Sequence, residues 1–289
     1  MITGKYSTGT YRSYRAVADS TRARQLADTS SPFSIEVRFL GGLKPSHENA
    51  FSRAADRWTN VIVGDLDTAV VGDDVIDDLL IEAEGVAIDG VGNVLGQAGP
   101  TDFRDVDTVA GALLRAKGVM RFDSDDLDQM EVDGTLVDVI THEMGHVLGI
   151  GTVWADFDLL KNPGTSNPTF TGRGASAEFG KLLGAGQAIP VPVANVGGPG
   201  SRDSHWRESV FRNELMSPSI AAAGNPLSRL TAASLGDLGY QVDVDAAEPY
   251  DLPDLLAAAT SGESLVREGL VNGGIVLPVI PSRTPAGRP

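Results

Sequence analysis

The sequence predicts an α+β protein with a mixed sheet and helices in its first half and an irregular second half. Three observations support this prediction. An alternating strand pattern at 34–40 is followed by an amphipathic helix pattern at 46–61. Short apolar segments at 79–87, 93–98 and 118–122 have strand character, and 150–204 is rich in Gly, Pro, Ser and Asn. Strands interleaved with helices favour a sheet covered by helices rather than an all-β or all-α fold.

Composition excludes several classes of function. The 289 residues carry 23 Lys and Arg against 39 Asp and Glu, a formal net charge of -16. A surface this acidic repels phosphate backbones, so we expect no nucleic-acid partner. No apolar run approaches the roughly 20 residues of a membrane helix, so we expect no membrane span. The chain has no cysteine, which excludes disulfides, thiolate zinc ligands and a thiol that masks a metal.

The elements of the first half follow from local patterns. Residues 1–32 are polar and without a period, so we expect a loose arm. The strand at 34–40 ends at Gly41–Gly42, and Ser46 is a suitable N-cap for the helix that follows. In that helix one apolar stripe is predicted to face the core, formed by Ala50, Phe51, Ala54, Ala55 and Trp58.

The second helix is predicted to begin near Thr135, where Thr135 and Asp138 have the spacing of a capping box, and to end at Gly149. Beyond it we expect a short helix at 175–183 and an amphipathic helix at 226–240. After about Pro249 the periodicity is lost. We therefore divide the chain into an arm at 1–32, an N-terminal subdomain at 33–150, a C-terminal subdomain at 151–250 and a tail at 251–289.

The segment HEMGH at 142–146 is the strongest chemical signal in the sequence. Histidines four residues apart on a helix offer both imidazoles to one metal ion, and the glutamate beside them can act as a base. On a helical wheel His142 and His146 lie opposite the apolar stripe of this helix, with Glu143 beside them. Gly145 and Gly149 lie on the same side, where another segment can approach closely. The alternative is a chance match on a solvated helix face.

A catalytic zinc site normally has three protein ligands, so a third must come from elsewhere in the chain. The metzincin pattern HExxHxxGxxH would place it at position 152, which is Thr152. Asp156, Glu178 and Glu208 are carboxylate candidates. His205 is the preferred candidate because the other two ligands are imidazoles, and it lies at the end of the Gly- and Pro-rich insertion. His47 is expected to be an exposed histidine without a special role.

The motifs together resemble a known family. HEMGHVLG, a long insertion, SHW and then ELM before Ser-Pro, eleven residues past His205, are similar to leishmanolysin-type metzincins. The resemblance implies a metzincin-like fold, with a twisted mixed sheet in the N-terminal subdomain and the zinc-site helix at a cleft. It implies zinc ligands His142, His146 and His205, the general base Glu143, the motif glycine Gly149 and the Met-turn methionine Met216. Without cysteine, the chain resembles a compact, bacterial-type relative.

The resemblance further implies a zinc endopeptidase that acts on protein or peptide substrates. An extended peptide is expected to pair with a sheet edge, for which the strand at 93–98 is the candidate. Some metzincins have a tyrosine two residues after the Met-turn methionine, but here that residue is Pro218. We expect a secreted protein, although no signal peptide pattern is visible in the first thirty residues.

Two other functions and one other ion remain as alternatives. The first alternative is a non-catalytic metal-binding or matrix protein. The second is a zincin with a carboxylate as third ligand. The acidic segment FDSDDLDQMEVDG at 122–134 fails the EF-hand spacing. We interpret it as a solvated turn, with Ca²⁺ binding as the alternative.

Overall fold

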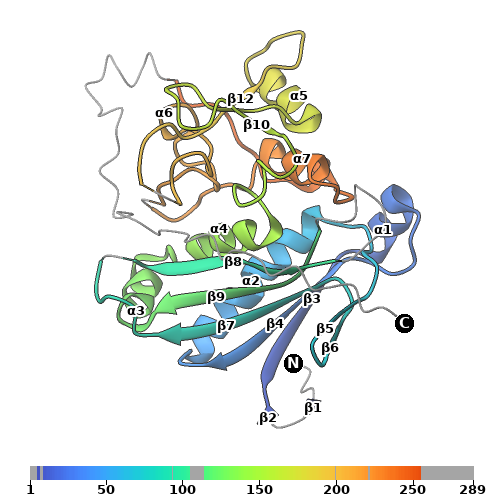
Figure 1. Cartoon of the computed structure of the whole chain (residues 1–289), viewed down its shortest axis with the longest axis vertical. Helices are drawn as coiled ribbons and strands as arrows, with labels where there is room; N and C mark the ends of the chain where they lie inside the picture. Colours follow the sequence, from blue (N-terminus) through green and yellow to red (C-terminus); the bar gives the residue numbers. More distant parts are fainter. Residues whose placement is uncertain are drawn as a thin grey trace.

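The central element is a five-stranded mixed sheet, as the sequence predicts (Figure 1). The computed structural model describes residues 5–6, 9–92, 94–104, 114–198, 200–220 and 222–254. The strand order is β3 (Arg12–Val17), β4 (Ser34–Gly41), β7 (Leu79–Val86), β9 (Arg115–Asp123) and β8 (Gly96–Phe103). β4, β7 and β9 are parallel, whereas β3 and β8 are antiparallel to their neighbours and form the two edges. The strand expected at 93–98 therefore begins later, and Asn93 lies outside the described residues.

The segment expected to be a loose arm contributes regular structure to the sheet. β3 pairs along its whole length with β4, and α1 (Ser20–Ala27) follows with Asp19 as its N-cap. The side chains that β3 buries are Ser13 and Ala16. Because both are small and not strongly hydrophobic, the sequence does not show which side chains of this strand are buried. A two-stranded hairpin of β1 (Lys5–Tyr6) and β2 (Gly9–Thr10) precedes it.

One face of the sheet is covered by α2 (Pro45–Val61) and α4 (Leu136–Leu148). The predicted stripe of α2 is buried, and Phe51 packs edge-to-face against Phe39 of β4 and Phe122 of β9. The N-cap of α2 is Lys44 and not Ser46, because Pro45 occupies the first turn, where its missing N–H and fixed φ are tolerated. The predicted capping box of α4 is absent too, since the Thr135 side chain makes no capping bond.

The other face of the sheet carries a polar network and a hairpin that the sequence did not indicate. Arg38 of β4 and Lys117 of β9 both form ion pairs with Asp74, which belongs to the hairpin of β5 (Ala69–Val71) and β6 (Asp74–Ile76).

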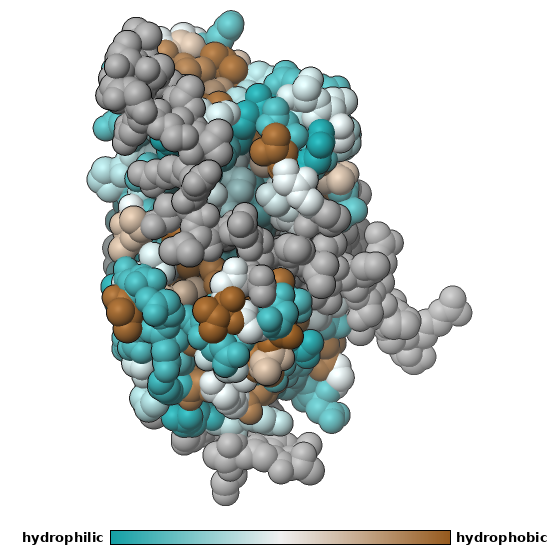
Figure 2. All heavy atoms as spheres, turned by 90° about the vertical axis from the view of Figure 1, so that its left-hand side faces the viewer, coloured by the Kyte–Doolittle hydropathy of each residue, from teal (hydrophilic) through white to brown (hydrophobic). Residues whose placement is uncertain are grey.

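The described helices show no segment long and apolar enough to cross a membrane. The face shown in Figure 2 mixes hydrophilic residues with small groups of hydrophobic ones.

The second half of the chain lies on the far side of α4 from the sheet (Figure 1). It holds a small antiparallel sheet of β10 (Leu160–Lys161), β11 (Thr169–Phe170) and β12 (Val191–Pro192). Its helices are α5 (Arg173–Leu182), α6 (Glu208–Phe211) and α7 (Arg229–Asp237), followed by the 3₁₀ turn η1 (Val244–Ala246). Its core is aromatic, with Trp154 and Trp206 stacked at 4.8 Å and Phe170 against both. The helix predicted at 226–240 is shorter, since α7 spans only Arg229–Asp237. The predicted tail lies outside the described residues from 255 onward.

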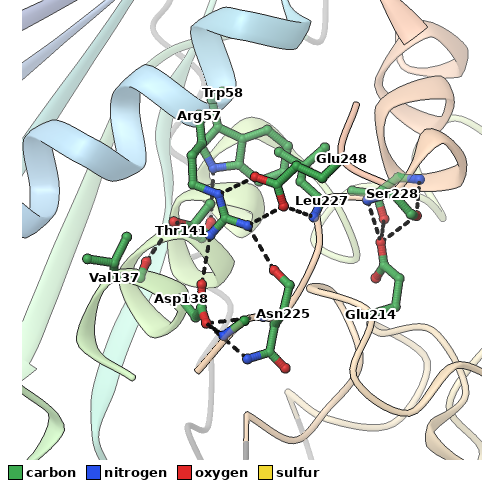
Figure 3. Close-up of polar contacts among 12 residues, drawn as sticks. Arg57, Trp58, Val137, Asp138, Thr141, Glu214, Asn225, Leu227, Ser228 and Glu248 are labelled. Carbon is green, nitrogen blue, oxygen red and sulfur yellow. Dashed lines mark hydrogen bonds and ion pairs between the residues drawn. The ribbon is translucent and has the colours of Figure 1, made fainter. Parts of the chain in front are cut away.

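Arg57 joins the two halves of the molecule (Figure 3). From α2 its guanidinium donates to Asp138 of α4 at 2.8 Å, to both carboxylate oxygens of Glu248 and to the Asn225 carbonyl. Asp138 also accepts the backbone N–H groups of Gly224 and Asn225. Burial would favour the neutral form, but the two carboxylates outweigh it and raise the pKa of Arg57. These contacts therefore hold residues 224–225 and Glu248 against α2 and α4.

Candidate metal centre

α4 carries the HEMGH motif and is buried along almost its whole length. Its apolar stripe faces the sheet, where Val147 fills the space left by Gly118 on β9. Its opposite side faces the second half of the chain, as the helical wheel predicts for His142 and His146. The helix ends at Gly149, whose φ of 114° is in the left-handed region that suits glycine, and the N–H of Gly149 caps the carbonyls of Gly145 and His146.

Three imidazoles meet at one point between α4 and the loop before α6. The Nε2 atom of His142 lies 3.0 Å from that of His205, and His146 Nε2 lies 3.1 Å from both. All three side chains are buried. The structure thus brings together the two motif histidines and the distant histidine that the sequence analysis preferred as third ligand.

The other ring nitrogens fix the protonation of these imidazoles. Nδ1 of His142 lies 2.7 Å from the Leu215 carbonyl, that of His146 2.8 Å from the Ile150 carbonyl, and that of His205 3.0 Å from the Ser201 carbonyl. A carbonyl oxygen only accepts, so each Nδ1 must carry the proton and donate. Burial lowers the pKa of His142 to about 4 and that of His205 to about 3. Burial also places the pKa of His146 well below its usual value.

This arrangement fits a metal ion. Three neutral Nε2 atoms direct their lone pairs at one another without a proton to share, which is unfavourable unless a cation lies between them. A tetrahedral zinc with bonds of about 2.0–2.1 Å separates its ligand nitrogens by roughly 3.3 Å, close to the distances here. Metal-binding histidines also typically donate their second N–H to a carbonyl or carboxylate, as all three do.

Glu143 lies beside the three histidines along α4 and is almost completely buried. Its Oε2 has no hydrogen-bond partner among the described residues. Burial raises the pKa of this carboxyl to about 8. A buried carboxyl with an unused oxygen is unusual, because a purely structural carboxylate is normally satisfied by donors. This makes Glu143 a candidate for a functional role.

Met216 lies under α4, and its side chain is completely buried. A Cβ atom placed on Gly145 would be 2.8 Å from the Met216 sulfur and 3.0 Å from the ring of Trp58. The predicted close approach at Gly145 is therefore confirmed, and the approaching residue is the methionine. The Trp58 indole also donates to the Thr141 carbonyl at 2.9 Å, which fixes this side of the helix.

The loop with His205 is held against the end of α4. Gly151 has a φ of 75°, and a Cβ atom there would collide with the Ser204 carbonyl, so only glycine permits this contact. His205 also pairs through its carbonyl with Ala194 N–H at 2.8 Å. Thr152, at the position of a metzincin third histidine, instead donates its hydroxyl to the His146 carbonyl at 2.9 Å. The insertion thus folds back on the helix.

The carboxylates considered as third ligands do not join the histidine group in the described part of the chain. Glu178 of α5 is bound by Lys181 and Arg229, at 2.6 Å and 3.0 Å. Asp156 is exposed, and Glu208 lies in the first turn of α6. Among the described residues, the group that could hold an ion with His142 and His146 contains His205 and no carboxylate.

A second cluster joins His47 to Asp128 and Glu131. His47 is buried, contrary to the expectation of an exposed side chain, because α3 (Ser124–Asp133) packs over the first turn of α2. Its Nδ1 accepts the Lys44 N–H at 3.4 Å, so its Nε2 carries the proton and faces the two carboxylates. A protonated Nε2 does not ligate a metal, so we interpret this cluster as a contact between helices.

The acidic segment after β9 is a helix and not the expected solvated turn. Asp123 caps α3, and its two oxygens accept the N–H groups of Ile88, Asp89, Gly90 and Asp125. Asp126 accepts the N–H of Gly92 at 2.8 Å. These side chains therefore hold the loop between β7 and β8. Ca²⁺ binding by this segment stays a prediction.

Sequence reasoning missed the groups that support the histidines. The acceptors at Leu215, Ile150 and Ser201 are backbone carbonyls, which have no signature in a sequence. Glu214 is also missed, because a charged residue directly before Leu215 and Met216 gives no sign in the sequence that it is buried. Its side chain is completely buried and accepts the Met216 N–H at 2.7 Å.

Comparison with known proteins agrees with the site. The leishmanolysin peptidase family model matches residues 106–252, half of the chain, and this range contains all three histidines. The chain is 32% identical over 124 residues to leishmanolysin of Leishmania tropica, covering 40% of this chain and 19% of that protein. It is 30% identical over 146 residues to leishmanolysin of Leishmania donovani, covering 48% and 24%. The chain thus aligns with only a fifth to a quarter of the length of these relatives. On the match of the family model to half of its residues, the chain belongs to the leishmanolysin family.

Proposed function

We propose that this protein is a zinc-dependent endopeptidase with His142, His146 and His205 as metal ligands. The observation that carries the proposal is the convergence of three unprotonated Nε2 atoms beside a buried glutamate. When bound, zinc would supply a Lewis acid that polarises a peptide carbonyl and lowers the pKa of a water. Membership of the leishmanolysin family supports the assignment.

In this proposal Glu143 is the general base. It follows His142 directly on α4, and it is not part of the group of side chains that lie close enough to share an ion with His142. Glu143 accepts the proton of the attacking water and delivers it to the departing amine. The site is enclosed by buried side chains, so the field of these few groups is little screened by solvent.

We further propose the metzincin arrangement, with residues 33–150 and 151–250 as two subdomains on either side of the cleft. Met216 then has the role of the Met-turn methionine, with its sulfur against Gly145 and not toward the ligands. Gly149 ends the helix and allows the chain to turn into the second subdomain. The burial of Met216 and the left-handed conformation of Gly149 support these roles.

The substrate is proposed to be an extended stretch of protein or peptide. β8 is one of the two edge strands of the sheet in the described part of the chain and packs against α4, so its outer edge can pair with such a backbone. A pocket of about 350 Å³ is lined by Leu95, directly before β8, by residues of α3 and by the segment after Met216. Its apolar lining favours an apolar substrate side chain and includes Val91, Leu95, Met130, Val139 and Ile220. We also propose that the protein acts outside the cell.

The test is zinc content and peptidase activity measured on one preparation. We expect about one zinc per chain by elemental analysis, and hydrolysis of casein that disappears with a chelator and returns with added zinc. Bound zinc without hydrolysis of casein or a peptide library would favour a non-catalytic metal protein. A preparation that takes up no zinc after refolding with the metal would contradict the proposal.

A further inference from the structure

The Glu214 carboxylate has an unusual environment. It is completely buried, and no ion pair with a lysine or arginine is found for it within the described part of the chain. Four neutral donors surround it: the N–H of Met216 at 2.7 Å, the N–H and hydroxyl of Ser228 at 3.3 and 2.6 Å, and the hydroxyl of Thr231 at 2.5 Å. Figure 3 shows Glu214 and Ser228 in this contact. Burying a carboxyl in this way is costly, so its position calls for a reason.

One oxygen of Glu214 supports the residue that orients His142. Its Oε2 accepts the Met216 N–H, which fixes the peptide plane between Leu215 and Met216. That peptide plane contains the Leu215 carbonyl. The same carbonyl accepts the Nδ1 proton of His142 at 2.7 Å. The peptide group between Leu215 and Met216 thus connects Glu214 to the imidazole of His142.

The other oxygen supports the neighbour of His205. Glu214 Oε1 accepts the Thr231 hydroxyl, and the oxygen of this hydroxyl accepts the Trp206 indole N–H at 2.8 Å. The direction of both bonds is determined, because the indole only donates and the carboxylate only accepts. Trp206 also donates its backbone N–H to the Met216 carbonyl at 3.0 Å. Since Trp206 follows His205 in the chain, both connections restrict the backbone that carries the third imidazole.

We propose that Glu214 is a positioning residue, which sets the orientation of His142 and His205 through the Leu215 carbonyl and Trp206. The proposal rests on the proposed function, because it takes these imidazoles as zinc ligands. An acceptor-only group is required here, since all four of its partners point a proton at it. An amide in its place turns one acceptor into a donor and leaves at least one of these contacts unsatisfied. The His142 and His205 rings then lose their fixed orientation while the fold remains.

The test compares Glu214→Gln with a matched control. Asp78 is the control because it too is a buried carboxylate held by neutral donors, the N–H and hydroxyl of Ser34 and the N–H of Leu66. It lies next to β4 and away from the histidines. Asp78→Asn therefore reports the general cost of changing a buried carboxylate. A third variant, Thr231→Val, removes only the hydroxyl between Trp206 and Glu214.

Zinc affinity is measured by competition with a chromophoric chelator, and ligand geometry by the visible spectrum of the Co²⁺-loaded protein. We expect zinc affinity about 10–100-fold lower in Glu214→Gln, with a changed Co²⁺ spectrum, because groups that orient metal ligands typically have effects of this size. Thr231→Val should change both in the same direction and decides the matter if Glu214→Gln does not fold. Asp78→Asn should keep the parental affinity and spectrum.

Parental zinc affinity and Co²⁺ spectrum in Glu214→Gln, or in Thr231→Val where the first variant is unfolded, would overturn the positioning role. Equal losses in Asp78→Asn would overturn it too, because the effect would then follow from stability alone. A parent protein that binds no zinc would instead remove the proposed function. The two failures are thus distinguishable.

Discussion

Gly145 and Met216 are in direct contact, since any side chain on Gly145 would be placed against the methionine sulfur. The glycine lies between the two motif histidines, in the middle of a helix, where glycine normally costs about 1 kcal/mol relative to alanine. This cost is offset by the approach of the segment 214–217. The same approach brings the Leu215 carbonyl to His142. The identity of a residue that carries no chemistry therefore helps to determine the geometry of His142, about one helical turn away.

Gly145→Ala is expected to destabilise the protein, the reverse of its effect in an exposed helix. Its methyl group would lie 2.8 Å from the Met216 sulfur and 3.0 Å from the Trp58 ring. Overpacking of this kind costs about 1–3 kcal/mol, more than the gain in helix propensity. Urea unfolding measures the difference. Gly186→Ala is the control, because a Cβ atom there meets nothing within 4 Å. A Gly145 variant as stable as the parent would contradict the packing argument.

The parts of the fold that the sequence predicted are those with a strong hydrophobic period. α2, β4 and the helix with the HEMGH motif are confirmed, because their inward residues are large and apolar. β3 and α3 were missed for the opposite reason. β3 buries only Ser13 and Ala16, and half of the positions of α3 are acidic, so tertiary contacts and the Asp123 cap determine their structure.

The sequence predicted the side chains of the candidate site, but not the backbone contacts that bring them together. Glycine-specific contacts explain why the distant His205 reaches α4, since Gly151 allows the Ser204 carbonyl to approach. That contact joins residues far apart in sequence and has no signature in it. The sequence indicated His205 by its residue type, by its place at the end of the insertion and by the resemblance to a family. The carbonyl acceptors and the Glu214 network could not be predicted, because they depend on the course of the backbone.

Asp78 is predicted to make stability depend on pH. Burial raises the pKa of its carboxyl to about 6, although the N–H groups of Ser34 and Leu66 favour the charged form. Because the folded pKa is higher than the unfolded one, the folded state holds the proton more tightly. The stabilisation is complete below about pH 4 and is lost as the pH rises through about 6. A shift of about two pH units corresponds to about 3 kcal/mol at most.

The measurement is urea unfolding of the parent and of Asp78→Asn between about pH 4 and 7. The free energy of unfolding of the parent should fall more steeply with pH over this interval than that of the variant. Metal-free protein is used for both, so that the titration of the histidines contributes equally. Parallel curves would show that Asp78 does not titrate in this range.

His205→Ala is expected to weaken zinc binding strongly, whereas Glu178→Ala should leave it unchanged. His205 Nε2 lies within 3.1 Å of both motif histidines, while Glu178 is bound by Lys181 and Arg229. Zinc content after dialysis and the chelator concentration that removes the metal measure the effect. Asp156→Ala is a second control. Retention of zinc by the His205 variant, with loss in a carboxylate variant, would instead support a zincin with a carboxylate ligand.

Glu143→Gln separates proton transfer from metal binding. The substitution keeps the size of the side chain and removes its basicity, so zinc content and unfolding behaviour should match those of the parent. Peptide hydrolysis should fall by about 10²–10⁴-fold, the usual contribution of a general base. Glu131→Gln, on α3, is the control for the loss of one charge and should keep its activity, because Glu131 pairs with His47 and not with the three clustered histidines. The decisive measurement is kcat/KM on a fluorogenic peptide, with zinc content determined on the same samples.

Near-parental hydrolysis by a zinc-loaded Glu143 variant would show that another group accepts the proton. Loss of zinc together with activity would instead place Glu143 among the groups that hold the metal.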